Sequence, residues 1–390
     1  MSLRFALLIG LQAVGGLLLL FTLPLTLELL VLSPAACFPP RRLKQRLREQ
    51  QQLAVVVPAH NEETLITACV GSLLADRNIW VEVYVVAHNC TDRTAQLAAE
   101  AGARVLPLAG PGGKGLALDH GFRRALLGGA NGVLVIDADS VVSSNLVSVV
   151  AKALAGGADA VQTRYEVGNA TSNTKTRLAA LALVGMNVLR PRGRSRLGLS
   201  CGIFGNGFAL SARTLGRVPY SANSLVEDLE YHLRLLAAGV RVDFLDDATV
   251  LGEMPERPAA QSSQRARWEG GRTLMRRTHT LAMVGAILRG ELRLVEALLD
   301  LNARPLAMQV LLLILMLGIP LPWTRIYGGV SLTIGLIYVL VAAGLSPRPA
   351  QALKALLATP GYFAWKILMI PATRMASRKD AAWVRTERNG

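Results

Sequence analysis

The first apolar stretch of the chain is long enough to cross a membrane. Residues 5–32 contain a single acidic side chain, Glu28, and a helix of that length covers the roughly 30 Å of a bilayer's hydrocarbon core. A cleavable signal peptide is the alternative, but its apolar core would be shorter, about 7 to 15 residues. The basic run RRLKQRLR at 41–48 follows directly, which predicts that this side of the span is cytoplasmic.

Between residues 53 and 250, short runs rich in β-branched residues alternate with stretches of helical period. The order is LAVVVPA, ITACVGSLLA, VEVYVVA, TAQLAAEAG, GLALDHGFRRALLG and GVLVIDAD. Strands that take turns with helices predict an α/β domain whose mostly parallel sheet is covered on both faces. Ligands are then expected at the carboxyl ends of the strands.

A second apolar region begins near residue 305. Residues 305–322 and 327–345 predict two further spans, joined by a short turn at 323–326 into an antiparallel hairpin. The apolar segment 356–373 is interrupted by a proline and a lysine, and crossing there would place the basic tail outside. We therefore expect this segment to lie in the interface plane, which leaves three spans.

Composition favours a membrane protein over a nucleic-acid-binding one. Hydrophobic residues make up 52% of the chain and the net charge is +15, an unusual pairing for a soluble protein. The positive charges cluster beside apolar runs, at 41–48, 272–277 and 374–388, where they would meet anionic lipid headgroups. Aromatic residues are only 5%, which leaves few platforms for base stacking. The four cysteines have no C-x-x-C spacing, which argues against a zinc site or a disulfide framework.

A polar turn follows each of the first two predicted strands, and a Gly-rich turn lies further along, before the strand that contains VLVI. The first two contain His60, Asn61, Glu62, Glu63, His88, Asn89, Thr91 and Asp92. Thr91 or Asp92 is also explained as a cap of the next helix. In GGKGLALDHG at 112–121, a Gly-rich turn carries Lys114 at a helix start, where N–H groups and the ammonium charge suit a phosphate. The spacing is not that of a P-loop, so ATP-type binding is not supported.

Acidic pairs give the stronger signals. Asp137 and Asp139 follow the apolar run VLVI, and two carboxylates one residue apart suit Mg²⁺ or Mn²⁺, with a solvated turn as the alternative. Glu227 and Asp228 open an amphipathic helix at 224–239, where stabilisation by the helix dipole is the other explanation.

A further motif lies between the acidic helix and the second apolar region. Gln264, Arg267 and Trp268 stand at the spacing Q-x-x-R-W, where an arginine can clamp a diphosphate and a tryptophan can stack on a sugar ring. Chance in a basic interfacial helix is the alternative.

In this order, and flanked by membrane spans, the D-x-D, E-D and Q-x-x-R-W motifs resemble the membrane-integrated members of glycosyltransferase family 2. That group includes cellulose, chitin, hyaluronan and poly-N-acetylglucosamine synthases, and the resemblance covers residues 50–275. It implies a GT-A-like, Rossmann-type α/β fold with transmembrane helices at both ends.

The resemblance also implies roles for individual residues. Asp137 and Asp139 would hold the metal and the diphosphate, and Asp228 would be the catalytic base beside Glu227. The remaining predicted nucleotide, acceptor and diphosphate contacts are Pro58, Asn61, Glu62, His88, Lys114, Gly205, Asn206, Gly207, Phe208, Gln264, Arg267 and Trp268. Family members usually carry an aspartate on the second strand to contact the base, whereas this chain has Ala87 and His88, so uridine is a preference.

The predicted function is inverting transfer of a sugar, preferably from a UDP-sugar, to a growing β-linked polysaccharide at the cytoplasmic face of the plasma membrane. Transfer of one sugar to a lipid-linked acceptor is the alternative, because three spans make a self-contained export channel tight and a polymer would call for an accessory export subunit. A non-catalytic nucleotide-sugar-binding subunit is a third possibility, and no G-x-G-x-x-G supports a dehydrogenase. Nucleic acid is not an expected partner.

The predicted organisation has six parts. They are a transmembrane helix at 1–34, a basic linker at 35–50, a cytoplasmic glycosyltransferase domain at 51–255, interfacial helices at 256–304, a transmembrane hairpin at 305–346, and an interfacial helix with a basic tail at 347–390.

Overall fold

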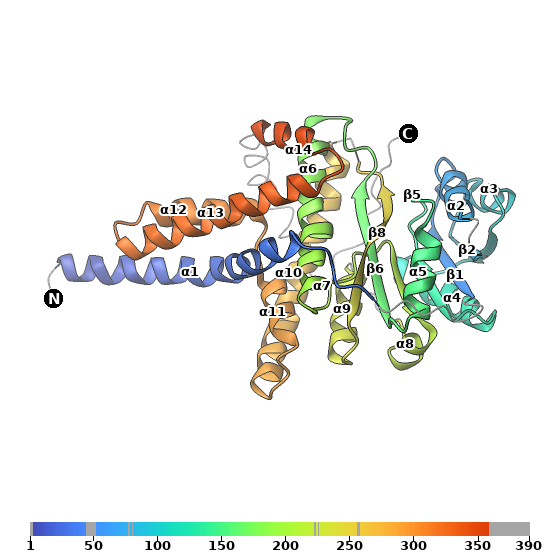
Figure 1. Ribbon diagram of the computed structural model, residues 1–390, viewed down its shortest axis with the longest axis horizontal. Coiled ribbons are helices and arrows are strands. Elements are labelled where there is room, and N and C mark those ends of the chain that lie inside the picture. Colours follow the sequence, from blue (N-terminus) through green and yellow to red (C-terminus); the bar gives the residue numbers. More distant parts are fainter. Residues whose placement is uncertain are drawn as a thin grey trace.

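The computed structural model describes residues 3–43, 52–76, 79, 81–221, 224, 226–255 and 258–358. An α/β domain lies at one end of the molecule and an arm of long helices projects from it (Figure 1). Most of the predicted basic run at 41–48, most of the predicted interfacial segment at 356–373 and the whole basic tail lie outside the described residues.

The domain is built on one eight-stranded sheet with the order β3-β2-β1-β4-β7-β6-β8-β5. The strands are β1 (Leu53–Ala59), β2 (Val81–His88), β3 (Arg104–Leu108), β4 (Gly132–Val135), β5 (Ser140–Val142), β6 (Ala160–Val167), β7 (Phe208–Ser211) and β8 (Val242–Gly252). Strand β7 runs antiparallel to its neighbours β4 and β6, and β5 runs antiparallel to β8, while the other pairs are parallel. The prediction of a mostly parallel α/β sheet is confirmed.

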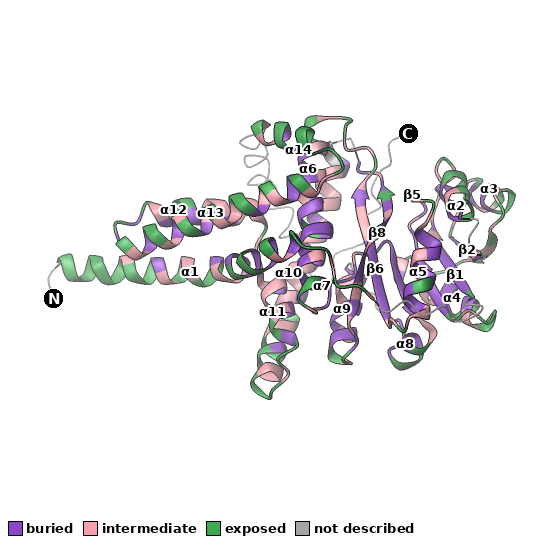
Figure 2. Ribbon diagram, viewed as in Figure 1, coloured by how far each residue is buried: buried purple, intermediate pink, exposed green. Residues whose placement is uncertain are grey.

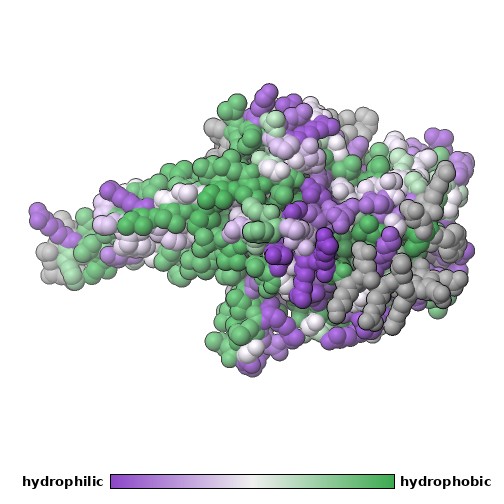
Figure 3. Space-filling view, viewed as in Figure 1, coloured by the Kyte–Doolittle hydropathy of each residue, from purple (hydrophilic) through white to green (hydrophobic). Residues whose placement is uncertain are grey.

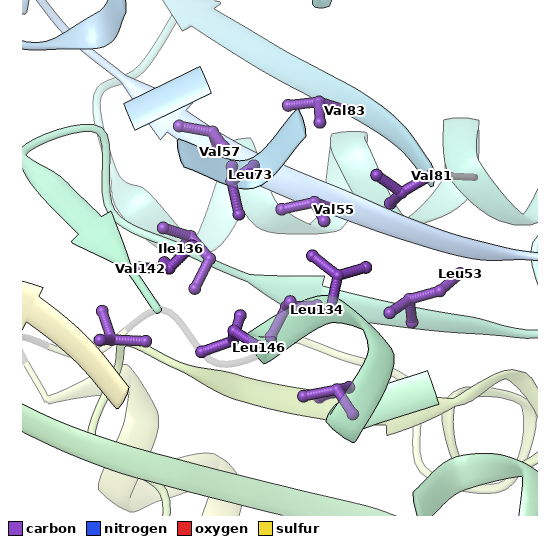
Figure 4. Packing of buried hydrophobic residues seen from close by; sticks show 14 of the residues in the cluster. Leu53, Val55, Val57, Leu73, Val81, Val83, Leu134, Ile136, Val142 and Leu146 are labelled. Atoms are coloured by element: carbon purple, nitrogen blue, oxygen red, sulfur yellow. The ribbon is translucent and has the colours of Figure 1, made fainter. Parts of the chain in front are cut away.

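Helices cover both faces of this sheet. They are α2 (Ile66–Leu74), α3 (Thr94–Glu100), α4 (Lys114–Leu127), α5 (Leu146–Ala155), α8 (Ala212–Arg217) and α9 (Glu227–Ala237). Successive residues of a strand point to opposite faces, so Val55 and Val57 of β1 join the core under α2 and α5 (Figure 4). Val56 joins the second core, under α4 and α9. Because both faces are covered, β1 is an almost continuous apolar run.

A second group of helices connects the sheet to the arm. Helix α6 (Thr174–Val184) continues through a π-helical turn, η1 (Gly185–Leu189), into α7 (Arg190–Arg196). Helix α7 packs closely on α1 (Leu3–Ala36), and a Cβ atom at Gly193 would lie 2.6 Å from the backbone oxygen of Leu32. Only glycine allows the two backbones to approach this closely.

The arm consists of α1 together with α12 (Leu306–Leu317) and α13 (Pro322–Leu345), which lie side by side (Figure 1). Its outer side chains are exposed and apolar (Figures 2 and 3), as at Leu20, which is 68% exposed, and Ile326, which is 67% exposed. A surface of this size without polar cover is typical of helices that contact lipid.

Three more helices lie where the arm meets the domain. They are α10 (Pro258–Leu288), α11 (Leu294–Asn302) and α14 (Pro349–Ala355), the last of which continues into a short 3₁₀ turn, η2 (Leu356–Ala358).

The predicted hairpin exists, but its turn is five residues earlier than predicted. The turn is formed by residues 318–321, and the predicted turn at 323–326 lies inside α13. Gly318 ends α12, Pro320 cannot continue a helix, and Pro322 occupies the first turn of α13, where proline is favoured.

Because α12, the first helix of the hairpin, is shorter than predicted, the number of helices that can span a membrane changes. Among the described residues, α1 and α13 are long and apolar enough to cross a membrane, and a third span requires the pair α11 and α12, which is bent by 76°.

The close approach of α4 to β1 gives a test of the packing. A Cβ atom at Gly121 of α4 would lie 2.4 Å from Cγ1 of Val56, so Gly121→Ala should destabilise the protein by about 1 to 3 kcal/mol and lower its Tm. The matched change Gly71→Ala in α2 meets no atom within 4 Å, and it should leave Tm unchanged or raise it. Thermal unfolding in detergent measures both, and equal Tm values would contradict this packing.

Candidate active site

A cavity of about 950 Å³ opens at the carboxyl ends of β1, β2 and β4 and continues between the helices of the arm. Ligands of open α/β sheets bind at such strand ends. Of the residues predicted from the sequence, it is lined by Pro58, Glu62, His88, Lys114, Asp137, Asp139, Gly205, Glu227, Asp228, Gln264, Arg267 and Trp268. Asn61, Asn206, Gly207 and Phe208 are not among its lining residues.

The two aspartates stand on a tight turn after β4. The N–H group of Ser140 donates to the carbonyl oxygen of Asp137 at 3.1 Å, and this bond closes the turn. The Ser140 hydroxyl group donates to Asp139 at 3.1 Å. Strand β4 is fully buried, and the chain leaves the core at this turn, so both carboxylates reach the cavity wall.

Lys114 connects this turn to the loop before β7. It begins α4, as the sequence predicted, and its ammonium group pairs with the carboxylate of Asp137 and donates to the carbonyl oxygen of Gly205 at 2.7 Å. Burial would lower the pKa of Lys114, but the charges of Asp137, Glu227 and Asp228 together raise it above the usual value. The lysine is therefore a permanent cation at the centre of the site.

Asn206 braces the site from behind the cavity wall. Its side chain is 1% exposed, accepts the backbone N–H of Asp137 at 3.1 Å and donates to Ser140 at 2.9 Å. Gly205 and Gly207 flank it with φ angles of +74° and +71°, which favour glycine. Phe208 begins β7 and is buried in the core.

Two residues of β6 hold this loop in place, and no motif in the sequence marked them. Gln162 donates to the carbonyl oxygen of Asn206 at 2.8 Å and accepts the N–H of Phe204 at 3.0 Å. Thr163 donates to the carbonyl oxygen of Gly207 at 2.8 Å. Both side chains are fully buried, and nothing in the sequence of β6, AVQTRYEV, distinguishes them from its other polar residues.

The third acidic residue meets the other two at this point. Helix α9 begins at Glu227, as predicted, and a Cβ atom at Gly205 would lie 3.2 Å from Oδ2 of Asp228 and 3.6 Å from Nζ of Lys114. Burial and the charge of Asp228 raise the pKa of Glu227 to about 7, against the opposing charge of Lys114. Burial also raises the pKa of Asp228, against the N–H group of Leu229 and Lys114.

The turn after β1 is tied to the turn after β2. The side chain of Asn61 accepts the N–H of Thr91 at 2.8 Å and donates to its hydroxyl group at 3.2 Å. Asp92 accepts the N–H of Thr94, the first residue of α3, at 3.0 Å, but the N-cap of α3 is Arg93, so neither Thr91 nor Asp92 occupies the predicted capping position. These bonds shape the cavity edge that Pro58 and Glu62 line.

His88 lies at the end of β2, beside the Gly-rich turn. Burial lowers its pKa, against the carbonyl groups of Pro111 and Gly113, so the ring is neutral at pH 7. Its Nε2 atom is buried without a hydrogen-bond partner among the described residues. A neutral imidazole has one donor and one acceptor nitrogen, which suits the edge of a nucleobase.

Helix α10 supplies the wall opposite the sheet. Gln264, Arg267 and Trp268 stand at positions i, i+3 and i+4 of this helix, so they share one face, and all three line the cavity.

A buried network of charges joins helix α1 to this wall. Glu28, the single acid of the first span, is 3% exposed and accepts from Arg190 at 2.7 Å and from Arg194 at 2.6 Å. Both arginines also pair with Asp300 of α11, which receives Arg272 of α10 at 2.8 Å. The sequence showed Glu28 as an exception in an apolar run but gave no sign of its partners.

Comparison with known proteins agrees with this geometry. A profile of the family described as "Glycosyltransferase like family 2" matches residues 50–271, more than half of the chain, and the chain belongs to this family. Probable glycosyltransferase YdaM of Bacillus subtilis (strain 168) is 26% identical over 247 residues, which are 58% of this chain and 57% of YdaM. The chain thus spans little more than half the length of that relative.

A solved structure supports the fold. Mannosyltransferase PcManGT from Pyrobaculum calidifontis, in complex with GDP-Man and Mn²⁺, superposes with a TM-score of 0.53 at 17% identity, over 94% of this chain and 97% of its own. This similarity confirms the predicted GT-A-like sheet. Glucosyl-3-phosphoglycerate synthase from Mycobacterium tuberculosis, in complex with Mn²⁺, UDP and phosphoglyceric acid, gives a TM-score of 0.39 at 23% identity, over 61% of this chain and 80% of its own.

The charge network makes a prediction about stability. Glu28→Gln leaves two buried arginines with one carboxylate fewer, so it should destabilise the protein by about 3 to 5 kcal/mol and lower Tm. Asp159→Asn removes the exposed pair with Arg213 and should cost less than about 1 kcal/mol. Thermal unfolding in detergent compares the two, and a Glu28 variant as stable as the Asp159 variant would exclude a structural role for the network.

Proposed function

We propose that this glycosyltransferase transfers one sugar, with inversion, from a nucleotide-diphosphate sugar to a lipid acceptor at the membrane surface. One observation carries the proposal. A single cavity joins the carboxylates at the sheet edge, including Asp137 and Asp228, to apolar side chains of the membrane arm such as Leu29 and Leu313. A donor dissolved in water and an acceptor held in a bilayer can therefore meet in it.

The donor occupies the sheet side of the cavity. Lys114 at the start of α4 and Arg267 on α10 are cations on its wall, and they bind the diphosphate. The neutral ring of His88 contacts the base, with uracil as the preferred partner. Trp268 faces the sugar.

Asp137 and Asp139 fit a divalent cation. Both offer carboxylate oxygens at the cavity wall, and no group of three or more His, Cys, Asp or Glu side chains forms a metal cluster in the described part of the chain. Mg²⁺ is commonly held by one or two carboxylates plus substrate phosphates, and this donor set matches that pattern. When bound, Mg²⁺ or Mn²⁺ neutralises charge on the diphosphate.

Asp228 is the base in the proposed reaction, with Glu227 beside it. Its carboxylate takes the proton from the acceptor hydroxyl group while the acceptor oxygen forms a bond to the anomeric carbon. The bond from that carbon to the diphosphate oxygen breaks, and the nucleoside diphosphate leaves with the electron pair. One displacement inverts the centre, so an α-linked donor gives a β-glycoside.

The membrane helices favour a lipid acceptor over the predicted polysaccharide. A polymer needs an enclosed path across the bilayer, and the described residues provide two spanning helices, or three with the bent pair. The space between these helices is instead lined by apolar side chains, which suit an acyl or prenyl chain. The polysaccharide prediction rests on the Q-x-x-R-W motif and would require the accessory export subunit.

We place residues 51–255 in the cytoplasm and residues 256–304 in the membrane interface. The arm's direction fixes the bilayer normal, and α10 and α11 run across that direction beside it (Figure 1). Leu281, Leu288 and Leu292 near their connection are exposed and apolar, which suits a shallow position among lipid headgroups. In this arrangement the helices at 1–34 and 305–346 enter the bilayer, and the linker at 35–50 and the tail at 347–390 lie partly outside the described residues.

The product identifies the acceptor. Protein in native-lipid membranes, incubated with radiolabelled UDP- and GDP-sugars and Mn²⁺ or Mg²⁺, should yield one glycolipid with a single added sugar, and EDTA should abolish it. Asp228→Asn should lower kcat by roughly 10²- to 10⁴-fold. Glu230→Gln on the same helix, whose side chain does not line the cavity, should stay within about twofold of wild type. A ladder of products would show that the product is a polysaccharide and not a single glycolipid. Full activity of Asp228→Asn would exclude Asp228 as the catalytic base.

The electrostatics predict the pH dependence. Transfer needs ionised Asp228, and burial raises the pKa of this group, so kcat/KM should fall as the pH drops through a value above that of a free aspartate, about 4. Lys114→Gln removes a charge that lowers this pKa, so the acid limb of the pH profile should move to higher pH. Lys152→Gln, at an exposed position of α5, should leave the limb in place. If the acid limb of the pH profile does not move in the Lys114 variant, the assignment of Asp228 as the base is contradicted.

A further inference from the structure

Two polar side chains of the membrane arm line the cavity with hydrogen bonds left unmade. Gln309 of α12 is 3% exposed and Ser331 of α13 is 4% exposed, and both belong to the cavity wall. The Oε1 atom of Gln309 and the Oγ atom of Ser331 are buried and have no hydrogen-bond partner among the described residues. A polar atom buried in this way costs free energy unless a partner reaches it.

The orientation of the Gln309 amide is fixed by its other end. Its Nε2 atom donates to the carbonyl oxygen of Thr22 at 2.8 Å and to Oγ1 of Thr26 at 3.0 Å, and both threonines belong to α1. A carbonyl oxygen can only accept, so the amide nitrogen must lie on the side of α1. The free end of the amide is therefore its oxygen, which requires a donor.

The hydroxyl group of Ser331 is unusual for a helix. Serine and threonine inside apolar helices commonly donate to the carbonyl oxygen four residues earlier. Thr333 of the same helix does so, to Gly329 at 3.0 Å. Ser331 makes no such bond within the described structure, so its hydroxyl group is available to a ligand.

The two groups lie at the same level of the arm. Helices α12 and α13 form an antiparallel hairpin, and a Cβ atom at Gly328 would lie 3.3 Å from the carbonyl oxygen of Leu313. Gln309 precedes Leu313 by four residues, which is roughly 6 Å along α12. Ser331 follows Gly328 by three residues, which is roughly 4.5 Å in the same direction along α13. Both are therefore about one turn further from the connection between the helices.

The cavity wall around them is otherwise apolar. Its side chains come from all three helices of the arm and include Leu25, Leu29, Val310, Leu313, Leu332 and Leu336. A pure hydrocarbon such as a prenyl chain would fill this space but leave the oxygen of Gln309 unpaired. A tail that carries a hydroxyl group or an amide N–H at this level would both fill the space and donate to that oxygen.

We infer that Gln309 and Ser331 form a subsite for the tail of a lipid that carries a hydrogen-bond donor, a hydroxyl group or an amide N–H, within its apolar part. The donor binds Oε1 of Gln309, and Ser331 contacts the same polar group of the lipid. The inference rests on the proposed function, in which the acceptor enters from the bilayer. It defines the acceptor as a hydroxylated or amide-linked lipid rather than a prenyl lipid.

Matched probes test the subsite without any need for transfer. Methyl oleate has no donor, N-methyloleamide has an N–H group in place of the ester oxygen, and methyl ricinoleate has a hydroxyl group along the same chain. Equilibrium binding of the tritiated probes to the full chain in neutral detergent gives a Kd for each. One donor-bearing probe should bind about tenfold more tightly than methyl oleate. Preference for the amide indicates an amide-linked lipid, and preference for the ricinoleate indicates a hydroxylated chain.

Variants locate the preference, and the partition of each probe into micelles cancels between them. Gln309→Leu should weaken the preferred probe about tenfold and leave methyl oleate within about twofold, because only the acceptor oxygen matters to the difference. Ser331→Ala should weaken the preferred probe about threefold or more. Tyr327→Phe is the matched control. Tyr327 bonds to Thr22 and Thr26 in the same polar cluster but does not line the cavity, so the preference should persist.

Three results would overturn the inference. They are equal binding of all three probes to the wild type, a preference that survives in both Gln309→Leu and Ser331→Ala, and a preference lost equally in Tyr327→Phe. The last result would mean that the cluster only connects the helices. A donor preference without sugar transfer to any lipid would refute the proposed function and leave the subsite standing, whereas transfer without a donor preference would do the reverse.

Discussion

Lys114 is the positive charge around which the carboxylates of the site are arranged. Its ammonium group pairs with Asp137 and holds the carbonyl oxygen of Gly205, and Asp228 approaches the same glycine. Carboxylates gathered in a buried volume repel one another and lose hydration, which is why the pKa values of Glu227 and Asp228 are raised. One lysine offsets only part of this negative charge. The excess of negative charge is the physical reason for proposing that a divalent cation and Arg267 hold the diphosphate of the donor.

The membrane arm is part of the site rather than a separate anchor. Glu28 of α1 pairs with arginines of α7, which also pair with Asp300 of α11, and Arg272 of α10 reaches the same aspartate. Helix α10 carries the Q-x-x-R-W residues that line the cavity. A buried ion network has strict geometric requirements, so it fixes the orientation of the arm relative to the catalytic wall. The cavity therefore has one polar end and one apolar end in a defined relation.

Much of the fold could be read from the sequence because both faces of the sheet are covered. The run around Val56 is continuously apolar and is bounded by turns, and the helices between such runs keep their own period. The hairpin of the arm was also visible, but its turn was not, since an apolar helix and an apolar turn look alike until the prolines are placed. Pro320 and Pro322 fix that turn through their backbone restrictions.

Sequence by itself determined that Asp137 follows an apolar strand and that Lys114 and Asp228 stand at the starts of helices, and the order of the motifs gave the resemblance that marks Asp228 as the base. Only the tertiary structure decided that they meet, because contact between residues so far apart in the chain depends on the strand order and on the loop at Gly205. The same holds for Gln162, whose support of that loop has no local signature, because the backbone groups that it binds lie 42 and 44 residues further along the chain.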